Sequence, residues 1–374
     1  MNSRAQIRTE LRDTEWPLDY IDHDREIVRA IVVDEAGMYY FVRAVRDDEF
    51  GASTLIETSG GGVEPGEDPG EAIGRELREE LGVDAAILCK IGVVSDYYNL
   101  IHRHNINHYY LCRIRSFGDR RLTRDEMEKY HLSTLKLSYE EALAEYEKRS
   151  DTRLGRLIAK REMPILRRAK RLLEERRNTK VWCFGDSNTY GYDPRGFSGG
   201  RYAARWPELM ARETGFQVVN DGKNGRTIPC GERELLQLRR DAAGFGADVI
   251  VVMLGANDLL NGASAEAATA RMEVFLTQCS APHALLIGPP PMRRGAWVPE
   301  DRLVAESAKL SGQYRILAER AGIRFADAAG WNVDLAYDGV HFSEEGHARF
   351  ARGIARVLND LFNQESEAAG RAAP

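Results

Sequence analysis

Apolar and polar positions alternate in two different ways along the chain, and the change falls near residue 178. Before this point, β-rich apolar runs follow one another closely and helical patterns are few. After it, short apolar runs alternate with helical patterns, which is typical of a parallel sheet with helices on both faces. The pattern therefore predicts two α/β domains, and 374 residues are enough for each to bury its own core.

The first half is expected to contain a hairpin, further strands and two helices. Gly37 marks the hairpin turn, and Ser138 is the expected N-cap of the second helix. Residues 1–24 are polar and are expected to form a loose lead-in or an edge strand. The expected strands are 26–34, 39–45, 55–58, 86–94 and 108–114, and the expected helices are 69–81 and 137–147.

The second half begins after a charged helical run, 153–177, which Pro164 is expected to kink or restart. The expected strands are 180–184, 217–219, 248–254, 284–288 and 324–325, and the expected helices are 203–214, 233–243, 265–278, 301–321 and 344–362. We therefore divide the chain into a lead-in (1–24), a first domain (25–150), a helical connector (151–178), a second domain (179–363) and a tail (364–374).

Composition and charge narrow the class of protein. A net charge of −6 gives no reason to expect nucleic acid or an anionic membrane surface as a partner. No apolar run reaches the length that a membrane helix needs, and the N-terminus lacks the apolar core of a signal peptide. The cysteines are scattered without a CxxC pair, so neither disulfides nor zinc are expected and a reducing cytoplasm is indicated. They are Cys89, Cys112, Cys183, Cys230 and Cys279. The sequence leaves open a homo-oligomer.

A glycine-rich stretch followed by an acidic helix carries the first chemical signal. Gly61 is followed after five residues by Glu67 and after seven more by the run Arg75-Glu-Leu-Arg-Glu-Glu-Leu-Gly82-Val. Within it, Glu76, Glu79 and Glu80 have the i, i+3, i+4 spacing of one helical face. Three carboxylates repel unless cations lie among them, and Mg²⁺ prefers such oxygen ligands when phosphates complete its shell. A solvated face explains any one glutamate, but the whole set favours a metal site.

This stretch matches every fixed position of the Nudix box, and residues 25–150 resemble a Nudix hydrolase domain. The resemblance implies an α/β/α sandwich with a mixed sheet, and Mg²⁺ or Mn²⁺ as cofactor. It also implies cleavage of a nucleoside diphosphate linked to another group. The implied ligands are Gly60, through its carbonyl, Glu76, Glu79 and Glu80. Gly61, Glu67, Arg75 and Gly82 support them, with Arg75 expected to hold Glu67 by a charge-assisted bond. The general base is not identified.

Two other polar groups in this half have simpler explanations. The loop expected between the fourth and fifth strands carries Asp96 and Asn99 together with aromatic and histidine side chains. The aromatic and histidine side chains either stack a base or serve acid–base chemistry, or else the histidines are simply hydrogen-bonded or face solvent. They are Tyr97, Tyr98, His102, His104 and His108. The basic residues of 167–177 are interleaved with Glu174 and Glu175, so we interpret that run as a solvated helix rather than a nucleic-acid site.

The second half carries a nucleophilic set of residues. Ser187 directly follows the strand 180–184, and Gly225 and Asn257 follow the next two strands. Ligands of parallel α/β sheets lie beyond the carboxyl ends of the strands, so these three residues are expected at one edge. Asp338 and His341 are three residues apart near the end of the chain. Serine, histidine and carboxylate form a catalytic triad, and a glycine N–H and an asparagine amide are oxyanion donors.

These four blocks resemble the SGNH, or GDSL-type, hydrolases, and the resemblance covers residues 179–363. It implies a flavodoxin-like domain that acts on short acyl esters, notably acetyl esters, without a metal; hydrolysis and acyl transfer both remain open. The segments 253–258 and 287–292 resemble the arylesterase and acyltransferase branch. Asn188 and Tyr190 depart from that branch, so its acyl preference is not carried over. Trp206, Met292 and Trp297 either wall an acyl pocket or pack in a core or interface.

Together the two halves predict a bifunctional hydrolase of small molecules. Its substrates would be a nucleoside diphosphate derivative and a short acyl ester, with both groups on one acylated nucleotide as a further option. One alternative is an esterase whose Nudix half only senses a nucleotide. Another is a Nudix enzyme whose second half is an assembly module. The complete carboxylate set argues against the first alternative and the complete triad against the second.

Overall fold

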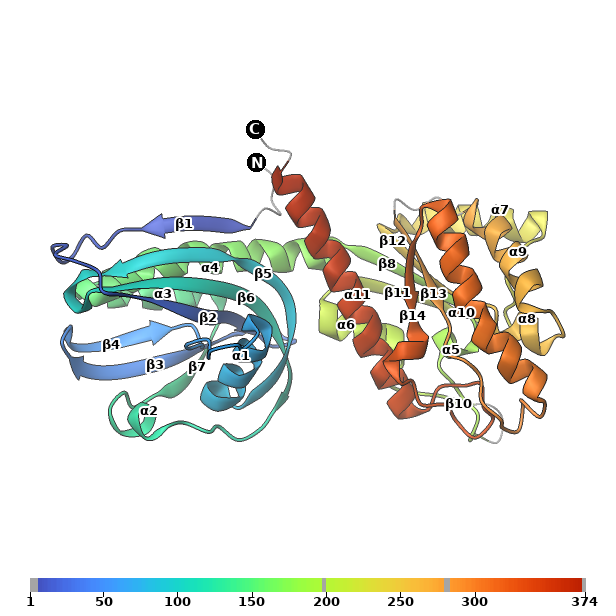
Figure 1. The fold of residues 1–374 in the computed structure, drawn as a ribbon, viewed down its shortest axis with the longest axis horizontal. Coiled ribbons are helices and arrows are strands. Elements are labelled where there is room, and N and C mark those ends of the chain that lie inside the picture. Colours follow the sequence, from blue (N-terminus) through green and yellow to red (C-terminus); the bar gives the residue numbers. More distant parts are fainter. Residues whose placement is uncertain (1–5, 197–199, 279–282, 372–374) are drawn as a thin grey trace. The chain divides into compact units, whose positions relative to one another are not determined.

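A computed structural model describes residues 6–196, 200–278 and 283–371 of the protein (Figure 1). The chain divides into two compact units. Unit 1 comprises Met1–Glu174 together with Asn359–Pro374, and unit 2 comprises Glu175–Leu358. Cys279 lies outside the described residues, and the four described cysteines form no disulfide.

Unit 1 is built on one seven-stranded sheet. Its strands are β1 (Ile7–Leu11), β2 (His23–Val33), β3 (Tyr39–Asp48), β4 (Gly51–Glu57), β5 (Val83–Tyr98), β6 (Arg103–Phe117) and β7 (Ser133–Leu137). They are ordered β1-β5-β6-β2-β3-β4, with β7 also paired to β3. The strand β2 runs parallel to β6 and antiparallel to β3, so the sheet is mixed and the predicted hairpin is present.

Helices cover both faces of this sheet (Figure 1). They are α1 (Pro69–Glu76), the π-helical turn η1 (Leu77–Leu81), the 3₁₀ turn η2 (Asn99–Ile101), α2 (Arg124–Glu128), α3 (Tyr139–Arg149) and α4 (Arg153–Asn178). One apolar core joins α3 and α4 to the sheet, and a second joins α1 and η1 to the other face. The predicted α/β/α sandwich is therefore confirmed. Ser138 caps α3 as expected, in a reciprocal capping box with Glu141.

The predicted loop between the fourth and fifth strands is wrong. The strands β5 and β6 are long antiparallel partners, and the three-residue turn η2 joins them. Tyr97 pairs with His104 and Tyr98 with Arg103 inside the sheet. The polar and aromatic composition of this segment concealed a regular pair of strands. Alternate residues of an antiparallel strand face opposite sides of the sheet, so only every second residue has to be apolar. At the other edge of β5, β1 adds a parallel edge strand, which was one of the two expectations for the lead-in.

Helix α4 runs as one helix through Pro164, so the chain does not restart a helix there. The apolar side of this helix packs in the core of unit 1, and two of its basic residues, Arg168 and Arg176, are buried rather than solvated. Arg176 donates to the backbone carbonyl of Thr214 at 3.2 Å, and its guanidinium lies over the Phe216 ring. Buried arginines of this kind are tolerated when carbonyls and ring faces replace water.

Unit 2 contains a five-stranded parallel sheet. Its strands are β8 (Lys180–Gly185), β11 (Gln217–Gly222), β12 (Val249–Met253), β13 (His283–Gly288) and β14 (Arg324–Asp327). The spatial order β11-β8-β12-β13-β14 is the 2-1-3-4-5 order of the flavodoxin-like fold, as predicted. A separate two-stranded sheet pairs β9 (Tyr192–Asp193) with β10 (Gly200–Arg201).

The connections of unit 2 are mostly helical (Figure 1). The elements are α5 (Ser187–Tyr190), α6 (Trp206–Thr214), α7 (Glu232–Phe245), α8 (Ala256–Leu260), α9 (Ala265–Leu276), α10 (Asp301–Ala321), the 3₁₀ turn η3 (Ala328–Trp331) and α11 (Glu344–Arg371). Helix α11 extends nine residues beyond the predicted end at Phe362, and its last part belongs to unit 1. No helix among the described residues combines the length and apolar character needed to cross a bilayer.

Candidate active sites

Three side chains of unit 2 form a hydrogen-bonded relay. Ser187 is the first residue of α5, directly after β8. Its Oγ lies 2.9 Å from Nε2 of His341, and Nδ1 of His341 lies 2.6 Å from Oδ2 of Asp338. All three residues are buried. The structure thus brings the predicted serine, histidine and aspartate into the order that a nucleophilic triad requires.

Asp338 is held as a charged acceptor. Its Oδ1 accepts the backbone N–H groups of Val340 and His341, both at 3.0 Å. Burial alone would raise the pKa of this carboxyl, but the bond from the His341 ring and the two backbone bonds outweigh burial and lower the pKa. The carboxylate is therefore ionised at neutral pH and can orient the imidazole.

Asn188 ties the serine to the segment that carries the histidine. Its Nδ2 donates to the carbonyl of Val340 at 3.1 Å, and its Oδ1 accepts the N–H of Phe342 at 2.8 Å. These two bonds bracket His341 on both sides, and Asn188 itself is buried. Asn188, one of the two positions that depart from the arylesterase branch, thus connects Ser187 directly to the histidine segment.

The two predicted oxyanion donors lie on neighbouring loops. Gly225 follows β11 and has a φ of 72°, in the region that glycine adopts without strain. The side chain of Asn257, after β12, donates to the carbonyl of Arg226 at 3.0 Å, the residue next to Gly225. Buried Asp258 supports the same loop, accepting the N–H of Ile228 at 3.0 Å. Because Nδ2 carries two hydrogens, Asn257 keeps a second donor while it holds this loop.

Aromatic rings flank the histidine of the triad. The ring centroid of His341 lies 4.7 Å from that of Tyr192 and 4.9 Å from that of Trp297. Trp297 is 46% exposed, whereas Trp206 and Met292 are buried. Of the three residues considered for an acyl pocket, Trp297 therefore lies at the site, and Trp206 packs on Phe350. Met292 belongs to the core and also lines a small pocket with Asn188 and Val340.

In unit 1 the glycine loop after β4 lies directly against two of the glutamates. A Cβ on Gly61 would lie 2.4 Å from Oε1 of Glu76, and a Cβ on Gly60 would lie 2.0 Å from the carbonyl oxygen of Val28. Oε2 of Glu80 accepts the N–H of Gly60 at 2.9 Å and the hydroxyl of Ser59 at 2.7 Å. The absence of side chains at the two glycines is what allows loop and carboxylates to meet.

Arg75 gathers the other carboxylates. It makes two bonds of 3.0 Å to Glu67, as predicted, and also bonds Glu76 at 2.7 Å and Glu79 at 3.3 Å. The π-helical turn η1 ends at Gly82, which has a φ of 65°. Among the described residues no three carboxylate, imidazole or thiol groups converge as a ready metal cluster, because Arg75 holds Glu76 and Glu79 while Glu80 turns to the glycine loop.

The acidity of these carboxyls is strongly altered. Burial raises the pKa of Glu80 to about 8, and the bonds from Ser59 and Gly60 oppose this only in part. Burial also raises the pKa of Glu76, against the opposing effect of Arg75. Buried, destabilised carboxylates beside a glycine cradle are oxygen donors that a hard divalent cation would stabilise, so the residues fit Mg²⁺ or Mn²⁺.

One further glutamate of this site escaped the sequence analysis. The negative charge of Glu126, on the short helix α2, raises the pKa of both Glu76 and Glu80. Glu126 also lines one pocket with Glu80 and Gly61. It lies in an irregular stretch after β6 with no motif around it, so only the folded chain reveals its position.

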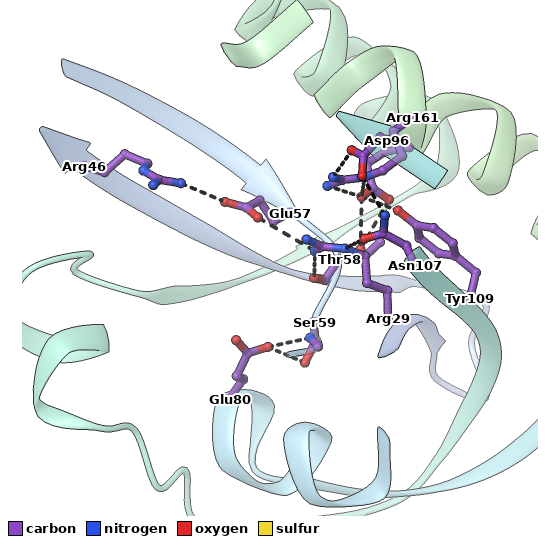
Figure 2. A network of polar contacts seen from close by, with 12 residues as sticks. Arg29, Arg46, Glu57, Thr58, Ser59, Glu80, Asp96, Asn107, Tyr109 and Arg161 are labelled. Atoms are coloured by element: carbon purple, nitrogen blue, oxygen red, sulfur yellow. Dashed lines mark hydrogen bonds and ion pairs between the residues drawn. The ribbon is translucent and has the colours of Figure 1, made fainter. Parts of the chain in front are cut away.

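A buried polar network supports the glycine loop from behind (Figure 2). Arg161 and Glu162 of α4 are almost fully buried and paired at 2.9 Å. Glu162 accepts the hydroxyl of Thr58 at 3.2 Å, and Arg161 donates to Asp96 at 2.8 Å. Thr58 immediately precedes Ser59, so helix α4 anchors the start of the loop that carries Gly60 and Gly61.

The predicted histidines lie apart from this site. His104 contacts Asp24 at 2.8 Å and His108 contacts Glu26 at 2.7 Å, while His102 stacks on Tyr20. Each therefore has a partner on the sheet or in the lead-in, and the simpler of the two interpretations holds.

Comparisons with known proteins agree with this division. The family model described as the NUDIX domain matches residues 23–154. The model described as the GDSL-like Lipase/Acylhydrolase family matches residues 183–349. Among curated proteins, the CTP pyrophosphohydrolase of Escherichia coli (strain K12) is 40% identical over 62 residues, which are 17% of this chain and 44% of that protein. The chain thus spans less than half the length of that relative.

Solved structures similar to this chain include two esterases. The native aryl esterase of M. smegmatis is 25% identical, with a TM-score of 0.44 and coverage of 49% of this chain and 99% of that chain. A carbohydrate acetylesterase from Sinorhizobium meliloti is also 25% identical, with a TM-score of 0.44 and coverage of 49% and 100%.

Proposed function

Because residues 23–154 form a Nudix domain and residues 183–349 form a GDSL-like acylhydrolase domain, we propose that this two-domain hydrolase has two working active sites. The Nudix half cleaves a nucleoside diphosphate linked to another group. The GDSL-like half removes or transfers a short acyl group, notably acetyl, from an ester. The observation that carries the proposal is the hydrogen-bonded series from Ser187 through His341 to Asp338. The same chain also contains every carboxylate of the Nudix box.

In the GDSL-like half, Ser187 is the nucleophile. Its Oγ forms a bond to the acyl carbon while its proton passes to Nε2 of His341, 2.9 Å away. Asp338 stabilises the resulting imidazolium. The carbonyl oxygen becomes an oxyanion, which the N–H groups of Ser187 and Gly225 and the amide of Asn257 would stabilise.

The second half of the cycle restores the serine. His341 gives its proton to the departing alcohol as the bond between the acyl carbon and the alcohol oxygen breaks. Water or a second alcohol then forms a bond to the acyl carbon and gives its proton to His341, which passes it to Oγ of Ser187 as the acyl–serine bond breaks. Every charge that develops in this sequence is offset by a group of the chain itself, so the reaction needs no metal. Trp297 and Tyr192 flank His341, so an aromatic or sugar ring of the alcohol would stack there.

In the Nudix half, Glu76, Glu79, Glu80 and the Gly60 carbonyl would hold Mg²⁺ or Mn²⁺. When bound, the metal offsets negative charge on the phosphoryl oxygens. Water forms the new bond to phosphorus as the bridging P–O bond breaks. Glu126 lines one pocket with Glu80 and Gly61, accepts the N–H of Thr123 at 2.7 Å and has no arginine partner among the described residues, so we assign it the role of accepting the proton of that water. Arg75 holds Glu76 and Glu79 in place through contacts of 2.7 and 3.3 Å.

A purely nucleotide-sensing Nudix half is the alternative. A domain that only binds a nucleotide does not need carboxyl groups with altered acidity. The burial of Glu80 and the contacts of Arg75 with three carboxylates therefore favour catalysis over sensing. Cys89, Cys112 and Cys183 are buried and form no disulfide, and on this basis we also place the protein in the cytoplasm.

One crossed experiment tests both assignments. Ser187→Ala and Glu79→Gln variants of the full chain are assayed with p-nitrophenyl acetate and with CTP plus Mg²⁺. We expect Ser187→Ala to lower ester turnover by about a thousandfold or more and to leave CTP cleavage intact. We expect Glu79→Gln to lower CTP cleavage by about a hundredfold or more and to leave ester turnover intact.

Each assignment fails on its own result. Ester turnover that survives Ser187→Ala, or that stops on adding EDTA, rules out the serine mechanism. A wild-type chain that binds nucleotides but cleaves no diphosphate with either Mg²⁺ or Mn²⁺ supports the sensing alternative instead.

A further inference from the structure

A charged pocket opens beside the Nudix carboxylates in unit 1. It has a volume of about 260 Å³, and its wall includes Gly60, Gly61, Glu80 and Glu126. The rest of the wall is rich in arginine, contributed by β2, β3 and β6. The lining arginines are Arg25, Arg29, Arg46 and Arg103.

Two of these arginines are neutralised within the protein. Arg46 donates to Asp48 at 2.6 Å and lies 3.9 Å from Glu57. Arg29 lies 3.8 Å from the other oxygen of Glu57 and donates to Asn107 at 2.9 Å (Figure 2). These contacts fix Arg29 and Arg46 as parts of the wall.

The other two have no carboxylate partner among the described residues. Nε of Arg103 is buried without a hydrogen-bond acceptor, and the guanidinium of Arg103 lies over the Tyr98 ring at 5.6 Å. Arg25 lies against the glycine loop, because a Cβ on Gly62 would lie 3.3 Å from its Nη2. An unsatisfied buried donor on a cation is costly and marks a place for an anion.

Arg25 and Arg103 also face each other. His23 pairs with Arg103 and Arg25 with Asn105 in the parallel β2–β6 ladder, so the two arginines are diagonal neighbours on one face of the sheet. Burial, and next the positive charge of Arg25, lower the pKa of Arg103. An anion placed between the two guanidinium groups would relieve this repulsion and satisfy the free donor.

We propose that Arg25 and Arg103 form a phosphate-binding site that is separate from the carboxylate cluster and selects substrates with a free terminal phosphate. This inference rests on the proposed diphosphatase activity and specifies its substrate class as a nucleoside triphosphate. A terminal phosphate carries a charge of about −1.5 to −2 at neutral pH, whereas an internal phosphate diester carries only about −1. Two unpaired arginines match the terminal group, and the guanidinium fork suits its oxygens.

The balance of charge in the pocket supports this choice. Four arginines line it against three glutamates, Glu57, Glu80 and Glu126. Glu57 is shared by Arg29 and Arg46, and Oε2 of Glu80 is already occupied by the hydroxyl of Ser59 and the N–H of Gly60. The excess positive charge is therefore concentrated at Arg25 and Arg103, where a terminal phosphate would lie while the carboxylates act on the bond to be broken.

The test compares substrates that differ at the end of the phosphate chain. KM and kcat are measured for CTP and for CDP-glucose with the wild type and with Arg25→Gln and Arg103→Gln. Each lost charge-assisted bond should raise KM for CTP by about tenfold or more, while KM for CDP-glucose changes by less than about threefold. Arg43→Gln is the matched control, because Arg43 lies on the same sheet, bonds Ser133 and is outside the pocket.

A direct binding measurement protects the result from folding defects. In EDTA, millimolar inorganic pyrophosphate should raise the unfolding temperature of the wild type and of Arg43→Gln, but not of the Arg25→Gln/Arg103→Gln double variant. If the glutamine variants do not fold, Arg25→Lys and Arg103→Lys are used instead. They keep the positive charge and should show part of the rise in unfolding temperature that pyrophosphate causes in the wild type.

The possible failures are distinguishable. Unchanged CTP kinetics and unchanged pyrophosphate stabilisation in the double variant overturn the phosphate site. An equal increase in KM for CTP and for CDP-glucose in the variants overturns the selectivity for a terminal phosphate. A wild type that cleaves neither compound, yet is stabilised by pyrophosphate through these two arginines, retains the site and overturns the diphosphatase activity.

Discussion

Asn188 joins two segments of the triad that lie 152 residues apart in the chain. Its side chain satisfies the carbonyl of Val340 and the N–H of Phe342, both next to buried His341. Replacing this amide by an apolar group leaves two buried backbone groups without partners, which costs about 1–3 kcal/mol each. Asn188 is therefore a positioning residue for the histidine.

We expect Asn188→Leu to lower kcat for p-nitrophenyl acetate by about ten- to a hundredfold with little change in KM. Asn188→Asp keeps the acceptor for Phe342 and should retain more activity than the leucine variant. The measurement is steady-state kinetics combined with thermal unfolding of both variants. A leucine variant with wild-type kcat would show that the two bonds do not position His341.

His347 makes unit 2 sensitive to acid. The residue is fully buried on α11, and burial first, then the positive charge of Arg205, lower its pKa to about 3. In the unfolded chain the imidazole titrates near its ordinary pKa of about 6.5, so between these values the unfolded state binds more protons than the native state. The contribution of His347 to stability is complete above about pH 6.5 and is lost as the pH falls towards 3.

This linkage predicts that the free energy of unfolding of unit 2 falls by up to about 1.4 kcal/mol for each pH unit below about 6.5 from His347 alone. His347→Phe keeps an aromatic ring against Tyr202 and Phe342 and should flatten that slope. Urea unfolding between pH 7 and pH 4 measures the difference. Parallel slopes for both proteins would assign the acid sensitivity to other groups.

At the scale of elements, the strands and helix ends that depend only on nearby residues were predicted from the sequence. The alternation in the second half identified each strand of the parallel sheet, because buried parallel strands are continuous apolar runs. Ser138 and Gly82 marked helix ends correctly, because capping depends on the residue itself. The motifs around Ser187 and Glu76 could be recognised for the same reason, because each is a short continuous stretch of sequence.

The remaining features depend on partners far along the chain. The ends of β5 and β6 were missed because cross-strand pairing, and not composition, extends them. Residues Leu77–Leu81 form the π-helical turn η1 instead of continuing the expected α-helix, and Arg75 holds Glu76 and Glu79. Glu126 and Arg103 belong to no motif, so their place beside the carboxylates required the folded sheet.

At the scale of the whole molecule, the two units are continuous through helices α4 and α11, each of which has residues in both units. Helix α4 ends two residues before β8, the strand that leads to Ser187, and its buried Glu162 anchors the glycine loop of the Nudix half through Thr58. One chain thus maintains two complete sets of reactive groups. Two such sets in one chain would be useful if one substrate molecule carried both an ester bond and a diphosphate bond.

We therefore expect an O-acetylated nucleoside triphosphate to be processed at both sites. The ester supplies an acyl carbon for Ser187, and the phosphate chain supplies the bond for the Nudix carboxylates. With 3′-O-acetyl-CTP, wild type should release acetate and cleave the triphosphate, Ser187→Ala should only cleave the triphosphate, and Glu79→Gln should only release acetate. Product analysis by mass spectrometry separates these outcomes. Acetate release from p-nitrophenyl acetate but none from the acetylated nucleotide would show that the two sites serve unrelated molecules.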